Sequence, residues 1–206
     1  MGITEQKKRA REDLRQRILE TAEALFVKEG YESVSMRKIA RQIEYSPTTI
    51  YHYFKDKGEL FSCLLEGYHG QLLALMEAIY LREDDPIAAV KEGMRAYTEF
   101  GIANPSYYKL AFMSPPEFRA ESYMVEGSKG TMLFMKLRAS VELCIQQGLF
   151  APMQADLAAQ VIWMMNHGVT SLLISNPNFP WADRNALLER VIETTIDGLR
   201  AGRGGQ

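Results

Sequence analysis

Apolar residues recur at intervals of three and four along most of the chain, which is the spacing of one face of an α-helix. The first such stripe consists of Leu14, Ile18, Ala22 and Leu25. Gly30 follows it, where a helix takes a left-handed terminal residue, and Ser35 is a suitable N-cap for a second helix. Because no segment alternates strictly between apolar and polar residues, the pattern predicts an all-α protein.

Further helix starts are marked by capping residues and prolines. Ser46-Pro47 begins a short third helix, and Asp56 with Glu59 has the spacing of a capping box for a fourth. Later helices are expected from Asp85-Pro86 and from Asn104-Pro105. Three more are expected over about residues 121–147, 156–174 and 184–200, the last capped by Asp183. The pattern predicts about nine helices in all.

The helices fall into two groups. Residues 1–60 contain three helices, and the turn between the second and third is about three residues, as in a helix–turn–helix unit that places a helix in the DNA major groove. We expect residues 1–60 to be a DNA-binding domain with a basic N-terminal arm and 61–201 a ligand-binding and dimerisation domain. Residues 202–206 are expected to be a flexible tail.

The charge distribution supports this division, although the whole-chain charge does not. The 206 residues are 47% apolar and 24% charged, with a net charge of −2, which is ordinary for a globular protein. Residues 1–60 carry 12 basic and 10 acidic residues, whereas residues 61–206 carry 12 and 16. The first 17 residues alone carry six basic and three acidic residues, so positive charge gathers at the helix–turn–helix end.

Several classes of protein are excluded by composition. Two cysteines, Cys63 and Cys144, are too few for a disulfide scaffold or a cysteine-rich zinc site. The charged N-terminal segment lacks the apolar run of a signal peptide, and no stretch reaches the roughly 20 apolar residues of a membrane helix. We therefore expect a soluble cytoplasmic protein that has no metal and no cofactor.

The short third helix carries side chains suited to reading DNA. Thr48 and Thr49 stand at its start, where hydroxyl groups reach base edges and thymine methyl groups. Tyr51, His52 and Tyr53 add hydrogen-bonding groups on rings that fit against a sugar-phosphate wall. The alternative is that these aromatic side chains merely cover the edge of a core.

Lys57 stands in the first turn of the fourth helix, where its charge opposes the helix dipole. An isolated protein is expected to gain nothing from a lysine there. A DNA phosphate bound at that helix end would explain it. The alternative is an ordinary solvated lysine.

These segments together resemble the DNA-binding head of the TetR family over about residues 8–61. The matching runs are residues 18–26 (ILETAEALF), 30–31 (GY), 35–40 (SMRKIA) and 46–54 (SPTTIYHYF), with Lys57 and Leu60. The resemblance implies a homodimeric all-helical regulator, usually a repressor that a small ligand releases from DNA, although the residues do not distinguish a repressor from an activator. It also implies DNA contacts by Ser35, Arg37, Thr48, Thr49, Tyr51, His52, Tyr53 and Lys57.

One residue departs from the family pattern. The turn between the second and third helices usually contains glycine, and this chain has Glu44. A left-handed conformation there would cost about 1 kcal/mol for a residue with a side chain. A carboxylate near DNA is also repulsive unless it accepts a hydrogen bond from a cytosine amine.

The second half resembles one TetR C-terminal subclass, in which an Asn-Pro-Xaa-Tyr corner and a Trp-to-His-Gly helix recur. Residues 97–112 and 163–168 carry this resemblance. Soft and aromatic side chains here are expected to line a cavity for a largely apolar effector. The expected contacts are Met94, Tyr97, Phe100, Tyr108, Phe112, Met132, Met135, Trp163, Asn166 and His167. The alternative is that these side chains are ordinary core.

The last two helices, about 156–174 and 184–200, are apolar on more than one face and must be covered. In the resembling family such a pair forms a four-helix dimer interface, which would set two recognition helices roughly 34–36 Å apart. The alternative is packing within one chain. Gly67 and Gly70 weaken the fourth helix, either as a hinge between head and core or for close helix packing.

Two other functions have partial support in the sequence. Glu66 and His69 have the Glu-x-x-His spacing of di-iron bundles, but those proteins need two such motifs and the chain has three histidines in all, so an enzyme is not expected. The second rival is a ligand-binding or partner-binding helical protein whose head does not bind DNA. The basic head argues against it.

Overall fold

The computed structural model describes residues 3–113 and 127–200. Within these ranges the chain forms nine α-helices and one π-helical turn, and no strand beyond an isolated bridge between Phe150 and Arg200. The prediction of an all-α protein with about nine helices is confirmed.

Four helices follow one another at the N-terminal end: α1 (Ile3–Glu29), α2 (Met36–Gln42), α3 (Pro47–Tyr51) and α4 (Lys57–Arg82). Gly30 ends α1 with a φ of 81°, as its sequence position predicts. Asp56 caps α4 by accepting a 2.8 Å hydrogen bond from the Glu59 N–H, while the Glu59 carboxylate accepts from the Lys55 N–H. The predicted helix starts in this region are therefore confirmed.

The head has a small core of its own. Three rings pack together: the centroids of Phe26 and Tyr31 are 5.2 Å apart, those of Phe26 and Phe61 5.8 Å, and those of Tyr31 and Phe61 4.9 Å. The fully buried aliphatic side chains beside them are Ile18, Ile39, Ile43 and Ile50. The apolar stripes of α1, α2 and α3 thus all face inward.

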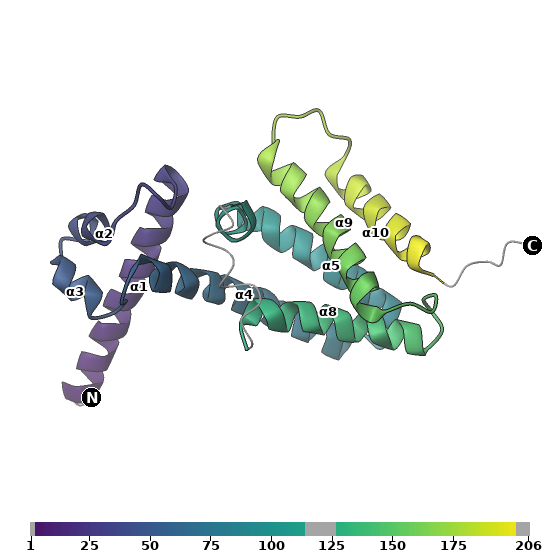
Figure 1. Ribbon diagram of the computed structural model, residues 1–206, viewed down its shortest axis with the longest axis horizontal. Helices are drawn as coiled ribbons and strands as arrows, with labels where there is room; N and C mark the ends of the chain where they lie inside the picture. The colour runs from purple at the N-terminus through teal and green to yellow at the C-terminus, as the bar shows by residue number, and fades with distance from the viewer. Residues whose placement is uncertain (1–2, 114–126, 201–206) are drawn as a thin grey trace, which may run out of the picture. The chain divides into compact units, whose positions relative to one another are not determined.

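The remaining helices are α5 (Pro86–Ala103), α6 (Pro105–Tyr108), the π-helical turn η1 (Lys109–Met113), α8 (Lys129–Gln146), α9 (Ala155–Ser175) and α10 (Arg184–Leu199). Helix α5 packs against α8, α9 and α10, and α9 packs against α10 (Figure 1). Their shared core includes Val90, Val141, Phe150, Ile162 and Ile192.

The predicted helix over residues 121–147 begins too early. Helix α8 starts at Lys129, because Ser128 caps it by accepting a 3.2 Å hydrogen bond from the Thr131 N–H. Gly127 precedes the cap with a φ of 83°, which a continuing helix does not allow. Residues 121–126 of the predicted helix lie outside the described residues.

The described residues form two compact units. One contains residues 3–67 with 109–113, and the other contains residues 68–108 with 127–200. Helix α4 contributes to both, and Gly67 is the last of its residues in the first unit. We call the first unit the head and the second the core, and describe each by itself. The expected domain division at residues 60 and 61 and the flexible tail stay predictions.

Candidate DNA-binding and effector-binding sites

The turn between α2 and α3 ends α2 in a Schellman motif. The Tyr45 N–H bonds the Ala40 carbonyl at 3.0 Å and the Glu44 N–H bonds the Arg41 carbonyl at 3.2 Å. Glu44, which donates the second of these hydrogen bonds, is the left-handed residue of the motif, with a φ of 61°. Glu44 is the one non-glycine residue with positive φ in the described part of the chain. The left-handed conformation considered from the sequence is therefore present.

Two serine side chains cap the starts of α2 and α3, and one of them, Ser35, is a predicted DNA contact. The Ser35 hydroxyl caps α2 by accepting from the Lys38 N–H at 3.2 Å. The Ser46 hydroxyl caps α3 by accepting from the Thr49 N–H at 3.1 Å, and it also lies 2.8 Å from the Thr49 hydroxyl. These hydroxyl groups position the two helices, and Thr49 is half-buried beside its cap.

Four of the remaining predicted contacts are exposed on the outer surface of α2 and α3, whereas Tyr53, which follows α3, is half-buried. Ile50 and Phe54 are buried and hold α3 against the head. Thr48, Tyr51 and His52 consequently point away from the head core, with Tyr51 52% exposed, and Arg37 is exposed on α2. The structure thus presents a hydroxyl, a phenol, an imidazole and a guanidinium at one helix–turn–helix surface, a donor and acceptor set suited to a DNA groove.

Lys57 has a structural partner that the sequence reasoning missed. Its ammonium donates a 2.9 Å hydrogen bond to the Tyr31 carbonyl and lies 4.0 Å from the centroid of the Tyr31 ring. A cation over a tyrosine face is stabilising. The expectation that an isolated protein gains nothing from Lys57 is therefore wrong. An ammonium has three N–H donors, so a phosphate contact remains a prediction beside this structural role.

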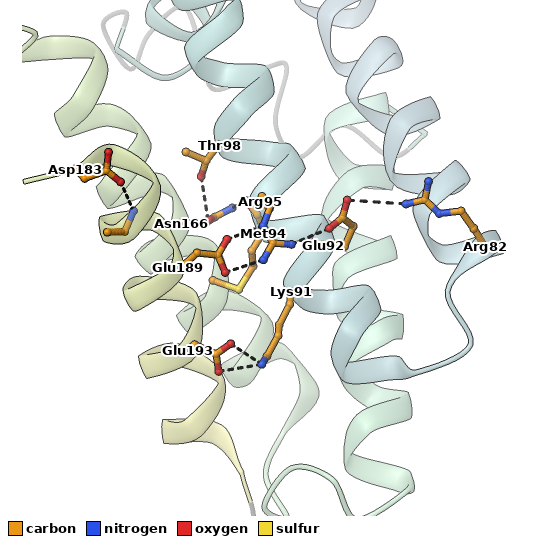
Figure 2. Close-up of polar contacts among 11 residues, drawn as sticks. Arg82, Lys91, Glu92, Met94, Arg95, Thr98, Asn166, Asp183, Glu189 and Glu193 are labelled. Atoms are coloured by element: carbon orange, nitrogen blue, oxygen red, sulfur yellow. Dashed lines mark hydrogen bonds and ion pairs between the residues drawn. The ribbon is translucent and has the colours of Figure 1, made fainter.

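In the core, a buried network of polar side chains ties α5 to α9. The Asn166 amide donates to the Met94 carbonyl at 3.0 Å and accepts from the Thr98 hydroxyl at 3.2 Å (Figure 2). Thr170 lies 3.0 Å from Thr98 and donates to the Asn166 carbonyl at 2.7 Å. We call Thr98, Asn166, Thr170 and the Met94 carbonyl the buried network. Its side chains are at most 4% exposed, so the network is sealed from water.

Ion pairs join the same α5 to α10. Lys91 contacts both carboxylate oxygens of Glu193, at 2.7 and 2.9 Å. Arg95 donates to both oxygens of Glu189, at 2.6 and 2.8 Å, and to Glu92 at 2.7 Å (Figure 2). The hydrogen bonds that Arg95 donates to Glu189 lower the pKa of the Glu189 carboxyl and raise the pKa of Arg95. Helix α5 is therefore fastened to two helices at once.

Aromatic rings from α5, α6, α8 and α9 form a continuous cluster. The Tyr108 hydroxyl lies 2.6 Å from His167 Nδ1, and the two rings stack with centroids 5.5 Å apart. The ring centroid of Trp163 lies 6.4 Å from that of His167 and 6.1 Å from that of Phe134. The Tyr97 ring is edge-on to the Tyr108 ring, with centroids 6.2 Å apart. Burial raises the pKa of Tyr97 to about 12, against the opposing effect of hydrogen bonds from Tyr108 and Trp163.

A second group of rings surrounds Tyr68 in the same unit. Tyr68 stacks on Tyr107 with centroids 5.3 Å apart and contacts Phe100 at 4.9 Å. His69 follows it in α4 and is 1% exposed. Burial lowers the pKa of His69 to about 4, so the imidazole is neutral near pH 7. Both ring groups consist of apolar faces with a few polar atoms, the composition of an effector site.

The predicted effector residues are therefore divided among several places. Five lie in the two ring groups: Tyr97, Phe100, Tyr108, Trp163 and His167. Met94 is 2% exposed within the shared helical core, and Asn166 belongs to the buried network. Met132 and Met135 are exposed on α8, and Phe112 belongs to the head unit. As effector contacts, all ten stay predictions.

Several structural residues of the core were missed from the sequence. Thr98 and Thr170 are β-branched polar residues that read as helix surface, and their partners lie 68 and 72 residues away. Arg95 and Glu189 are separated by 94 residues. The sequence offered only a local signal for these pairs. On α5, Lys91, Arg95 and Thr98 share a face at spacings of four and three, and on α10 Glu189 and Glu193 share a face at a spacing of four.

Two further features concern the described residues alone, namely groups that could hold a metal ion and helices that could cross a membrane. No group of three or more histidine, cysteine, aspartate or glutamate side chains is placed there to hold a metal ion. By length and composition, one helix, α9, is apolar enough to cross a membrane. A core or interface helix of a globular protein has the same composition, so the composition of α9 is weak evidence for a membrane span.

A helix–turn–helix head followed by a helical core defines the class of helical DNA-binding regulators. Comparison with family models gives the family. The model described as "Bacterial regulatory proteins, tetR family" matches residues 18–63, and that described as "Tetracyclin repressor-like, C-terminal domain" matches residues 90–195. The chain belongs to the TetR family of transcriptional regulators, as the sequence resemblance indicated.

Individual relatives agree with this assignment. The HTH-type transcriptional regulator HbdR of Aromatoleum sp. (strain CIB) is 25% identical over 166 residues, which are 76% of this chain and 71% of HbdR. The fatty acid degradation regulator FadR from Bacillus halodurans has a similar fold, with a TM-score of 0.73 at 18% identity over 91% of this chain and 97% of FadR. The ketosteroid transcriptional regulator KstR2 of Mycobacterium tuberculosis has a TM-score of 0.66 at 18% identity over 91% and 95% of the two chains.

Proposed function

We propose that this TetR-family regulator is a repressor that binds a palindromic operator as a homodimer and is released by a small, largely apolar effector. The observation that carries the proposal is the complete helix–turn–helix with its exposed outer surface. Thr48, Tyr51 and His52 stand on a helix whose opposite side is anchored by Ile50 and Phe54. Side chains of this kind on a buried scaffold support base reading rather than a catalytic role.

The homodimer is supported by the outer surfaces of α9 and α10. Leu157, Met164 and Leu172 are each about half exposed or more on α9, with Met164 at 70%. Gly168 lies between them, and a Cβ there would meet nothing within 4 Å. On α10, Leu187, Val191 and Thr194 recur at spacings of four and three and are half-buried or exposed. A second copy of the same pair would cover both and form a four-helix interface.

The dimer also accounts for the composition of α9. Only part of this apolar helix is buried within one chain, as expected if a second copy covers the rest. We therefore propose that α9 lies in a subunit interface of a cytoplasmic protein and not in a membrane.

The substitution Met164→Glu tests the proposed dimer interface. The Met164→Glu variant should place two like charges in the apolar contact and weaken dimerisation by at least about 100-fold. Leu81→Glu is the matched control, because Leu81 is 88% exposed on α4 of the same unit. Mass by light scattering over a dilution series measures the effect. A dimer that resists Met164→Glu contradicts the proposed interface.

The effector proposal rests on the two ring groups of the core. Their faces are apolar, and Tyr97, Tyr108, Trp163 and His167 supply a few hydrogen-bonding atoms. Such a composition favours a largely apolar compound. Two regulators of similar fold are named for fatty acid degradation and for ketosteroids, so a long-chain fatty acid and a ketosteroid are the first probes.

The decisive experiment is selection of binding sites from a random duplex library by the full-length protein near 150 mM salt. An enriched inverted repeat with half-sites about one helical turn apart supports the homodimeric DNA reader. Release of that duplex by either probe, measured by fluorescence anisotropy, supports effector control. If a folded dimer enriches no sequence, the chain is instead a ligand-binding or partner-binding protein that does not read DNA.

Transmission along α4 is proposed to depend on Gly67. A Cβ at Gly67 would meet nothing within 4 Å, so packing does not require glycine there. A Cβ at Gly70, in contrast, would lie 2.7 Å from the Lys129 ammonium nitrogen. Gly67→Ala should therefore stiffen α4 by up to about 1 kcal/mol without a clash. We expect it to weaken release by the effector while operator affinity stays unchanged, and an unaltered release curve would contradict the hinge.

A further inference from the structure

The N-terminal half of α1 carries positive charge on one side. Lys7, Lys8, Arg11 and Arg15 recur at spacings of three and four, so they share one face of the helix. Asp13 falls on another face at 100° per residue, whereas Glu5 and Glu12 stand at one edge of this face, at spacings of three and four from Lys8. We call Lys7, Lys8, Arg11 and Arg15 the basic stripe.

Contacts within the head fix where this stripe points. The Arg11 guanidinium lies 5.9 Å from the centroid of the Tyr53 ring, and that of Arg15 lies 5.1 Å from the Phe54 ring. Arg15 also donates to the Cys63 sulfur at 3.5 Å. Tyr53 and Phe54 directly follow the recognition helix α3. The stripe therefore faces the side of the head on which α3 lies.

The stripe continues past these contacts. Lys7 and Lys8 lie one helical turn before Arg11, about 5 Å further along the axis, and Figure 1 shows the first turns of α1 running beyond α3. Both lysines are exposed, and neither forms a hydrogen bond or ion pair within the described residues. The family model of the head begins only at residue 18, so these turns lie outside the matched helix–turn–helix region.

We propose that Lys7, Lys8 and Arg11 bind the phosphate backbone of DNA beside the bases that α3 reads, with Arg15 as the positioning residue that holds the stripe against the head. The inference rests on the operator binding proposed above. A row of exposed cations next to a recognition helix is complementary to a regular row of phosphates. The two lysines have free donors, whereas Arg15 is occupied by the head itself.

A pair of charge-matched variants separates this contact from general attraction. Lys7→Gln with Lys8→Gln removes two charges from the stripe. Arg9→Gln with Arg17→Gln removes two charges from the opposite side of the same helix, where both arginines are exposed. Glutamine keeps helix propensity in both variants, which circular dichroism of the full-length proteins checks.

Binding is measured against the selected operator duplex at several salt concentrations. Lys7→Gln with Lys8→Gln should lower the slope of log affinity against log salt by about 0.9 per lost phosphate contact, or about 1.8 per protomer. The variant with Arg9 and Arg17 changed should keep the wild-type slope. In addition, the wild type should bind more tightly when the duplex is lengthened by about half a turn on each side, and the lysine variant should not.

Three results overturn the proposal. Equal losses in both variants mean general electrostatic attraction, and a lysine variant equal to the wild type means a merely solvated face. A wild type that gains nothing from flanking DNA places no contact there. If the wild type binds no duplex of any length, the proposed DNA-binding function fails as well, which distinguishes that failure from the loss of this inference alone.

Discussion

The head and the core use polar side chains in opposite ways. In the head, Ser35 and Ser46 cap short helices and leave Thr48, Tyr51 and His52 on the surface. In the core, Thr98, Asn166 and Thr170 bond one another where water is excluded. The head therefore presents its hydrogen-bonding capacity to a partner, whereas the core uses that capacity to hold its own helices together.

This difference determines where a substitution is expected to act. Exposed polar groups of the head contribute little to stability, because water replaces their partners. Buried polar groups of the core contribute much, because removing one partner leaves the other without a hydrogen bond. Core substitutions should therefore change unfolding, and head substitutions should change DNA binding.

The largest effect is expected from Asn166→Ala. The change removes the partner of the Met94 carbonyl and of the Thr98 hydroxyl and leaves a cavity between α5 and α9. We expect the free energy of unfolding to fall by about 3 kcal/mol, measured by urea denaturation. Gln160→Ala, an exposed polar residue of the same helix, is the control and should change it by less than about 0.5 kcal/mol. Comparable effects in both variants would contradict a sealed network.

The pH dependence of stability should report His69. The pKa of His69 is lowered by burial from 6.5 to about 4, so the unfolded chain binds the additional proton between these values. Stability due to this group is complete above pH 6.5 and is lost as the pH falls toward 4, by about 3 kcal/mol in total. Urea denaturation between pH 4 and 7 measures the slope.

Two histidine variants assign that slope. His69→Gln should flatten it, because glutamine does not titrate. His52→Gln should leave it unchanged, because His52 is exposed on the head surface. An unaltered slope in His69→Gln would show that another group is responsible.

The sequence predicted the head better than the core, for a physical reason. Caps such as Ser35 and Ser46 act on N–H groups within three residues of themselves, so local sequence identifies them, as it does Asp183 at the start of α10 in the core. Their helices begin where predicted. Ser128 carries the same signal, and the prediction of a helix from residue 121 did not use it.

Residues of the core depend on partners far along the chain, and a local pattern does not contain that information. Trp163 and His167 were expected on one face, and their rings are 6.4 Å apart. Met132 and Met135 were expected inside and are exposed, because helical spacing gives a shared face without saying which side it meets. The pairing of Arg95 with Glu189 needed the fold itself.

An intermediate effect is expected for the ion pairs between α5 and α10. A double-mutant cycle with Arg95→Met and Glu189→Gln should give a coupling of about 1 kcal/mol that falls with added salt, since the pair is bidentate but partly exposed. The pair Arg200 and Asp197, more exposed at the end of α10, should give about 0.3 kcal/mol. Equal couplings would contradict a special role for the α5 contacts.

The smallest effect is expected in the head, at Glu44. Because its φ is 61°, replacement by glycine should relieve strain and raise the free energy of unfolding by about 0.5–1 kcal/mol. Glu44→Ala removes the same carboxylate but keeps a Cβ in the left-handed conformation, so it should give no such gain. Thermal unfolding of the three proteins at one salt concentration measures the difference. Because both variants lose the same charge, a gain shared by both would mean that charge repulsion, rather than backbone conformation, opposes folding at the helix–turn–helix turn.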